Sequence, residues 1–160
     1  MTPKDNVILE VKNLNVEFTT DDGVVHAVNN VSYTVERGKT LAIVGESGSG
    51  KSVSSLAIMG LLTGTNSNVT GEVFFNGKEL VGAHPDEVRK LRGDEMAMIF
   101  QDPLSALHPY YTIGDQLIEA VLVHNKISEE AARERAIEML IKVGISSVEQ
   151  RIDEYPHQLS

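Results

Sequence analysis

The first third of the chain alternates apolar and polar residues with the period of a β-strand. Apolar side chains recur at every second position from Leu9 to Phe18, with one slip at Lys12-Asn13 that indicates a bulge or tight bend. Asp21-Asp22-Gly23 is typical of a hairpin turn, and the alternation resumes from Val31 to Val35. This region therefore predicts an antiparallel hairpin.

Two later runs are apolar at nearly every position. They are "TLAIV" at 40–44 and "MAMIF" at 96–100, and such runs are typical of strands buried on both faces. Between them, "GEVFFNG" at 71–77 predicts a strand that ends in an Asn-Gly turn. The three segments extend the expected β-structure beyond the hairpin.

Helical periodicity dominates elsewhere. From 51 to 62 the apolar residues surround most of the helix axis, which predicts a buried helix. Thr112 is a suitable N-cap for a helix that reaches about His124, and Ser128 for a second helix that ends at Gly144. The last third of the chain is therefore expected to be helical.

Composition narrows the class of protein. The chain has 160 residues, 41% hydrophobic and 23% charged, which suits about one globular domain. It has no cysteine, which excludes disulfides and thiol catalysis and fits a reducing compartment. The formal net charge of −9 argues against a nucleic-acid partner, and no apolar stretch is long enough for a membrane helix. We therefore expect a cytoplasmic protein.

The residues with the clearest chemical meaning form the stretch "GESGSGKS". It contains Gly, four free positions, Gly, Lys and Ser, between a predicted strand and a predicted helix. Its backbone N–H groups can surround phosphate oxygens, the lysine can reach the β- and γ-phosphates, and the last serine can bind Mg²⁺; a plain Gly-rich turn is the alternative. We predict that a nucleotide is held by Gly45, Glu46, Ser47, Gly48, Ser49, Gly50, Lys51, Ser52 and Val53, with a catalytic role for Lys51.

Two further motifs establish a resemblance to a known family. "VGESGSGKSVSSLAIMGLL" is followed by "AMIFQDPLSALHP" and then "YPHQLS". In order and spacing the chain resembles the ATP-binding subunits of ABC transporters, above all those of dipeptide and oligopeptide importers. The resemblance spans nearly the whole chain.

The resemblance implies roles for three more residues. Gln101 matches the Q-loop glutamine, which implies a catalytic role and Mg²⁺ binding, although a glutamine at the end of a strand can also serve only local backbone. Phe18 matches the aromatic residue that stacks on adenine, although it also continues the apolar face of its strand. Ser160 matches the second residue of the "LSGG" signature, which contacts the nucleotide of the opposite subunit. The segment after Gln101 is expected to expose Leu107, Tyr110 and Tyr111 toward a membrane partner.

The expected fold is α/β. It is a P-loop NTPase core of the ABC ATPase type with an antiparallel β-subdomain and a helical subdomain, truncated before the Walker B strand. Residues 1–160 would form the N-terminal part of one nucleotide-binding domain. Its expected parts are β-rich segments at 7–45 and 71–80, the P-loop and helix at 45–62, a core strand and Q-loop at 96–101, and the helical subdomain at 102–160.

The resemblance also implies a function and a set of partners. The function is ATP binding and hydrolysis that energises import of dipeptides or oligopeptides, although this chain lacks the Walker B and catalytic carboxylates and is expected to show little turnover alone. The implied partners are transmembrane permease subunits, a second ATP-binding subunit in a homo- or heterodimer and, indirectly, an extracytoplasmic substrate-binding protein. The implied location is the cytoplasmic face of the cell membrane, as a peripheral subunit.

Three alternatives remain open at this point. The chain could be a nucleotide-binding fragment without hydrolysis. It could serve an importer of another cargo, such as nickel or a sugar. An ABC-type ATPase of DNA repair or chromosome structure would need a basic surface or a long coiled-coil insertion, and the sequence shows neither.

Overall fold

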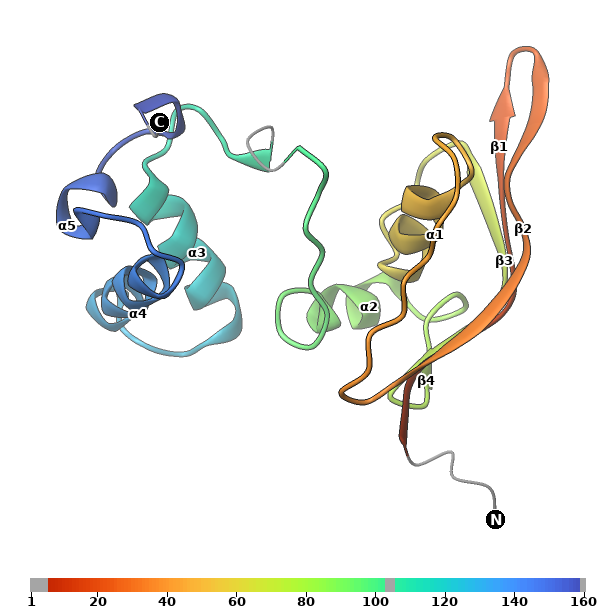
Figure 1. Cartoon of the computed structure of the whole chain (residues 1–160), viewed down its shortest axis with the longest axis horizontal. Coiled ribbons are helices and arrows are strands. Elements are labelled where there is room, and N and C mark those ends of the chain that lie inside the picture. Colours follow the sequence, from red (N-terminus) through yellow and green to blue (C-terminus); the bar gives the residue numbers. More distant parts are fainter. Residues whose placement is uncertain (1–5, 103–105, 159–160) are drawn as a thin grey trace. The chain divides into compact units, whose positions relative to one another are not determined.

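The computed structural model describes residues 6–102 and 106–158, and the chain divides into two compact units. The first unit covers Met1–Arg92 and the second Gly93–Ser160. A sheet and two helices form the first unit, and helices form the second (Figure 1). No helix within the described residues is long and apolar enough to cross a membrane.

A four-stranded antiparallel sheet organises the first unit, in the order β2-β1-β3-β4. Helix α1 lies against β1 and β2, which places the start of this helix beside the sheet (Figure 1). The elements of this unit are β1 (Val7–Thr20), β2 (Gly23–Glu36), α1 (Lys51–Ile58), β3 (Ser67–Phe75), β4 (Lys78–Glu79) and α2 (Pro85–Leu91).

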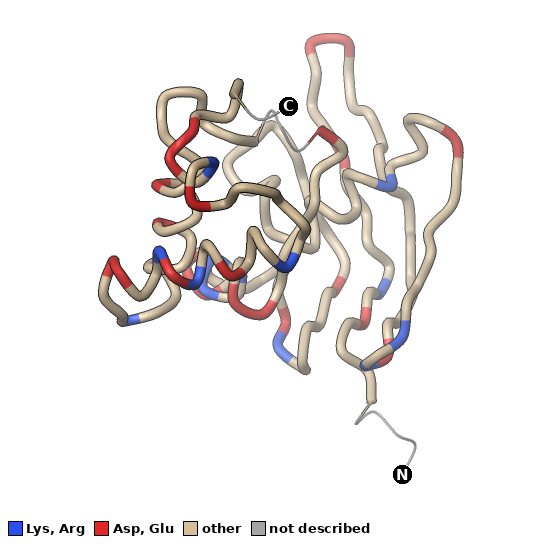
Figure 2. Tube along the Cα trace, turned by 60° about the vertical axis from the view of Figure 1, so that its left-hand side comes forward, with Lys and Arg blue, Asp and Glu red and all other residues tan. Residues whose placement is uncertain are grey.

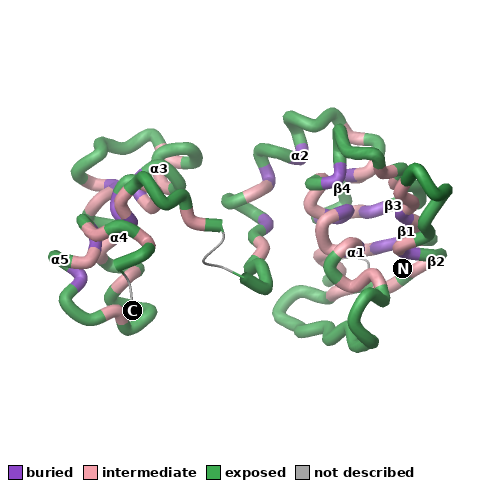
Figure 3. Tube along the Cα trace, turned by 90° about the horizontal axis from the view of Figure 1, so that it is seen from above, coloured by how far each residue is buried: buried purple, intermediate pink, exposed green. Residues whose placement is uncertain are grey.

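The hairpin and its bulge are confirmed. Thr20 pairs with Gly23 across the turn, and the register of β1 shifts between Val11 and Leu14 against β2. Asn13 has a φ of 48°, and its N–H donates to the side-chain Oγ of Ser32 on β2 at 2.8 Å. The apolar face of the sheet forms the core, and its most deeply buried side chains lie on β1 and β3 (Figure 3): Val11, Leu14, Val16 and Val73.

The strand at 71–77 is confirmed and is longer than expected. It begins at Ser67, and Asn76-Gly77 forms the turn that leads into β4. Helix α2 was not predicted. It begins with Pro85 at its first position, and His84 Nδ1 accepts a hydrogen bond from the N–H of Asp86 at 3.3 Å. Proline followed by two acidic residues was the sequence signal for this helix.

The two apolar runs do not form strands, and this part of the prediction was wrong. No strand is assigned at 40–44 or 96–100, although Met96 is buried. Val44 is 90% exposed and Ile99 is 91% exposed. A strand of this kind needs neighbours on both edges. No described strand pairs with either run, and Met96 forms only an isolated bridge, in which its carbonyl accepts from the N–H of Gly93 at 2.7 Å.

The helix that was expected to be fully buried is buried on one side only. Ser54, Ala57 and Ile58 face the interior, whereas Ser52 is exposed. The helix also ends at Ile58 instead of 62, because Gly60 adopts a φ of 65° and the following N–H bonds back to the Leu56 carbonyl at 2.9 Å.

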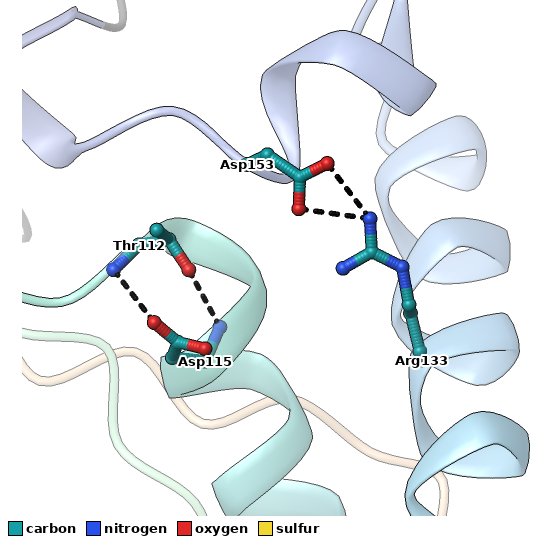
Figure 4. Close-up of polar contacts among 4 residues, drawn as sticks. All are labelled: Thr112, Asp115, Arg133 and Asp153. Carbon is teal, nitrogen blue, oxygen red and sulfur yellow. Dashed lines mark hydrogen bonds and ion pairs between the residues drawn. The ribbon is translucent and has the colours of Figure 1, made fainter.

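The second unit packs short helices around a small core. Its elements are α3 (Ile113–His124), α4 (Glu129–Lys142), α5 (Val148–Arg151) and the 3₁₀ turn η3 (Pro156–Gln158). Both predicted N-caps are confirmed. Thr112 Oγ1 accepts from the N–H of Asp115 at 3.0 Å while Asp115 Oδ2 accepts from the N–H of Thr112 (Figure 4), and Ser128 Oγ accepts from the N–H of Ala131.

An ion pair and close backbone contacts hold the last segment against α3 and α4. Arg133 Nη2 donates to both carboxylate oxygens of Asp153, at 2.8 and 2.9 Å (Figure 4). The N–H of Gly114 donates to the Ile152 carbonyl at 2.6 Å, and a Cβ at Gly114 would lie 2.8 Å from that oxygen. Glycine is therefore required where α3 approaches this segment.

Candidate nucleotide-binding site

The Gly-rich loop leads directly into α1. This helix begins at Lys51, and its N-cap Gly50 has the left-handed values φ 85° and ψ 3°. A Cβ at Gly50 would lie 2.1 Å from the carbonyl oxygen of Ala27 on β2. Glycine is therefore required at position 50 both for its backbone conformation and for the close approach of the loop to the sheet.

The ammonium group of Lys51 lies over the loop. Its Nζ donates to the carbonyl oxygens of Gly45 at 2.8 Å and Glu46 at 2.6 Å, and to Ser49 Oγ at 3.2 Å. The N–H of Ser49 also donates to the Glu46 carbonyl at 3.3 Å, which closes the turn. These contacts place a fixed positive charge beside the first turn of α1.

A cavity of about 490 Å³ opens next to this charge. One wall is β2 between His26 and Val31, and the other is the loop from Gly45 to Lys51 together with Ile43 and Val44. His26 Nδ1 lies 3.0 Å from Glu17 Oε1 across the hairpin. The cavity therefore joins the sheet to the start of α1 within one compact unit.

The electrostatics of this cavity favour an anion. The first turn of a helix has N–H groups without an intrahelical acceptor, and α1 has no acidic residue there. Ser52 is exposed at the same helix start, so its hydroxyl is accessible to solvent or to a ligand. Backbone donors, one ammonium group and one free hydroxyl are the groups that bind the phosphates of a nucleotide and its metal ion.

Of the other predicted site residues, one lies elsewhere on the sheet, one belongs to the second unit and one lies outside the described residues. Phe18 is half-buried on β1, where it pairs with Val25 and Ser67, and it does not line the cavity. Gln101 is exposed in the second unit and does not end a strand. Ser160 lies outside the described residues. The roles of these three residues stay predictions.

The β2 wall of the cavity was missed by the sequence analysis. Residues 26–31 lie 14 to 19 positions before Gly45, and their pattern is only that of a strand. The requirement for glycine at position 50 comes from a tertiary contact with Ala27 that no local motif encodes. The only sequence signal was the excess of glycines in the loop.

A clamp at Gln116 was also missed. Its Oε1 accepts from the N–H of His108 at 2.8 Å, and its Nε2 donates to the carbonyls of His108 and Tyr111 at 3.0 and 3.1 Å. The clamp holds a loop in which Tyr110 is 82% exposed and Tyr111 is exposed too, as predicted. The prediction for Leu107 was wrong, since its side chain is half-buried.

Comparison with known proteins defines the family. The family described as "ABC transporter" matches residues 28–160, a range that includes residues 28–31 of the β2 wall, the loop and α1. The chain belongs to the ABC transporter family. This membership confirms the resemblance seen in the sequence motifs and the expected α/β fold of an ABC ATPase.

Several curated relatives in this family are named for peptide transport. The chain is 50% identical over 154 residues to the dipeptide transport ATP-binding protein DppD of Bacillus subtilis (strain 168), a match that covers 96% of the chain and 46% of DppD. It is 46% identical over 155 residues to the oligopeptide transport ATP-binding protein OppD of Haemophilus influenzae, covering 97% of the chain and 48% of OppD. The chain therefore spans about half the length of these relatives.

Solved ABC cassettes have the same fold. A dimeric post-hydrolysis state of the ATP-binding cassette MJ0796, bound to ADP and Pi, superposes with a TM-score of 0.80 at 28% identity. The superposition covers 95% of this chain and 63% of that one. A second structure, cbiO1 from Clostridium perfringens, part of the ABC transporter complex cbiONQ, gives a TM-score of 0.67.

Proposed function

We propose that this chain provides the ATP-binding part of an ATPase that energises import of dipeptides or oligopeptides. The observation that carries the proposal is the position of Lys51, whose ammonium group is held over the Gly-rich loop beside the free N–H groups of α1. A nucleotide is the ligand that needs this combination, because its phosphates present several anionic oxygens within a few ångströms.

The residues of the loop have distinct parts in this proposal. Lys51 can turn from the carbonyls of Gly45 and Glu46 to phosphate oxygens, which replaces neutral acceptors with charged ones and strengthens each hydrogen bond. The N–H groups at the start of α1 donate to the same phosphates. Ser52 supplies a hydroxyl to Mg²⁺, and the match of Gln101 to the Q-loop glutamine supports a role for its amide in the same reaction. When bound, Mg²⁺ neutralises phosphate charge during phosphoryl transfer.

The peptide cargo and the partners rest on the relatives. DppD and OppD are named for dipeptide and oligopeptide transport, and both match at least 96% of this chain. The proposal accordingly includes transmembrane permease subunits at the cytoplasmic face of the cell membrane. It also includes a second ATP-binding subunit, which the dimeric state of the cassette MJ0796 supports.

The test of the nucleotide site compares two lysine variants. In Lys51→Ala the fixed charge over the loop is lost, so we expect the dissociation constant for MgATP to rise about tenfold or more. Lys142→Ala removes an equal charge from an exposed position at the end of α4 and should leave the affinity unchanged. Titration with a fluorescent ATP analogue measures both, and equal affinities would refute the phosphate site.

Turnover and cargo need separate measurements. Phosphate release measured beside binding separates an ATPase from a module that only binds nucleotide. Uptake of a labelled dipeptide and of nickel, in cells that carry or lack the gene, separates a peptide importer from one for another cargo. Loss of nickel uptake alone would exclude the peptide assignment and leave the nucleotide site intact.

A further inference from the structure

Strand β2 forms one edge of the sheet in the first unit. It comes last in the strand order β2-β1-β3-β4 and lies at one side of the sheet (Figure 1). Among the described residues, no backbone hydrogen bond joins residues 31–35 of this strand to any segment other than β1. Alternate N–H and C=O groups of an edge strand point away from the sheet, so this stretch offers its outward groups to another strand.

The stretch lacks the features that protect most edge strands. From 23 to 35 the strand contains no Lys, Arg, Asp, Glu or Pro, so this part of the chain is tan in Figure 2. The bulge at this level adds a residue to β1 and not to β2, because residues 11–14 of β1 lie opposite residues 31–33 of β2. Residues 31–35 are therefore a regular, uncharged edge, which lysine, proline or a bulge normally blocks.

The sequence of this stretch is symmetric in its chemistry. It is "VSYTV", with Tyr33 at the centre, a small hydroxyl side chain on either side of it and a valine at each end. Tyr33 and the two valines are half-buried, whereas Ser32 and Thr34 are exposed. Antiparallel strands run in opposite directions, so a second copy aligned at Tyr33 would place valine opposite valine, Ser32 opposite Thr34 and Tyr33 opposite itself.

We propose that two copies of this chain pair antiparallel along residues 31–35 of β2, around a twofold axis at Tyr33. The sheets of the two copies then join into one continuous sheet, and each copy contributes the same patch. Aromatic pairs and pairs of small hydroxyl side chains that lie directly opposite one another stabilise antiparallel strands. No like charges face each other, since Glu36 lies opposite Asn30 of the second copy.

A strand of another protein is the alternative occupant of this edge. The symmetry of the stretch favours a second copy, because pairing with an unrelated strand requires no such symmetry. The proposal also stands without the nucleotide site, since Val31 is the one residue of the stretch that lines the cavity beside the Gly-rich loop.

The direct test is the oligomeric state of the whole chain in solution. We expect sedimentation velocity to show a concentration-dependent equilibrium between monomer and dimer. Raising the salt concentration from about 0.05 to 0.5 M should favour the dimer, because salt screens the repulsion between two copies of net charge −9. A chain that stays monomeric at every concentration, or a dimer that salt dissociates, would overturn the proposal.

Paired charge variants test the symmetry of the interface. Each Thr34 lies diagonal to the Thr34 of the second copy, within reach of long side chains. Thr34→Lys and Thr34→Glu should therefore each weaken the dimer about tenfold or more, because each brings two like charges together. An equimolar mixture of the two variants should associate again, since each lysine then lies near a glutamate.

Thr19→Lys is the control for these variants. It makes the same charge change at an exposed position of β1, which is not an edge strand, and should weaken the dimer less. Association through the apolar run at 96–100 would respond equally to Thr34→Lys and Thr19→Lys. Equal association of these two variants, or no recovery in the mixture, would overturn pairing at β2.

Cysteine cross-linking tests the register of the pairing. The chain has no cysteine of its own, so introduced thiols report a single contact. Residues directly opposite one another in antiparallel strands have Cα atoms about 4.5 to 5.5 Å apart, which suits a disulfide. Mixed in oxidised glutathione, Ser32→Cys and Thr34→Cys should form a disulfide-linked heterodimer faster than either variant alone forms a homodimer. Equal rates in the mixture and in the separate variants would contradict alignment at Tyr33.

Discussion

The antiparallel sheet and the segment at 40–44 lie in the same unit and have similar aliphatic content, yet only the sheet is buried. Leu14 and Val16 on β1 have no exposed surface, whereas Leu41 and Val44 are exposed. β1 is paired along both edges, with β2 and β3. Residues 40–44 form no backbone hydrogen bond with another described residue.

The difference shows what each kind of pattern requires. The alternating strands β1 and β2 pair with each other locally, through the two-residue turn at Asp21-Asp22, and the sheet buries one face. A run that is apolar at every position must be covered on both faces and paired on both edges, and these neighbours come from distant parts of a chain. An alternating strand is therefore stable in a smaller unit than a continuous apolar run.

The largest expected effect comes from the same substitution in the two regions. Leu14→Ala should lower the free energy of unfolding by about 2 to 5 kcal/mol, because it leaves a cavity in a fully buried site. Leu41→Ala, at a position 43% exposed, should change it by less than about 1 kcal/mol. Urea denaturation followed by circular dichroism measures both. If the two losses are equal, the segment at 40–44 is packed in solution and the comparison fails.

A smaller effect is expected at the bulge that sets the register of the sheet. Gly71 on β3 has a φ of 104°, and a Cβ there would lie 2.5 Å from the carbonyl oxygen of Asn13. Gly71→Ala should therefore cost about 3 kcal/mol through backbone strain and displacement of β1. Gly77 also has a positive φ, but a Cβ there would have no atom within 4 Å. Gly77→Ala should therefore cost only about 1 kcal/mol of folding stability. Equal losses would show that the bulge is not held by this contact.

The parts of the fold that were predictable have local signals. The hairpin turn, the slip at Lys12-Asn13 and the caps at Thr112 and Ser128 each depend on residues within a few positions of one another. The runs at 40–44 and 96–100 were misjudged because an apolar run encodes the need for neighbours but not their presence.

The candidate site also has features that the sequence predicts and features that it does not. The spacing of the Gly-rich loop predicted Lys51 at the start of a helix, and the structure places it there. The approach of Gly50 to Ala27 and the clamp by Gln116 join segments through tertiary contacts, which a single sequence does not encode. Local chemistry was therefore predictable, and the walls around it were not.

The smallest effect on stability is expected for a substitution in the exposed run at 96–100. The same substitution tests whether this run mediates self-association. Ile99 is 91% exposed within the run at 96–100, and an unpaired apolar segment is a surface on which another chain can pair. Ile99→Lys should leave the free energy of unfolding within about 0.5 kcal/mol of the original value. It should also reduce concentration-dependent association in sedimentation velocity, because a lysine opposes edge pairing. Val143→Lys is the control, because it makes the same charge change at a position that is 73% exposed and lies outside the two apolar runs. It should reduce association less. If both lysine variants reduce association equally, net charge and not the apolar run controls association. The sheet and the exposed apolar runs would then differ less in solution than their burial implies.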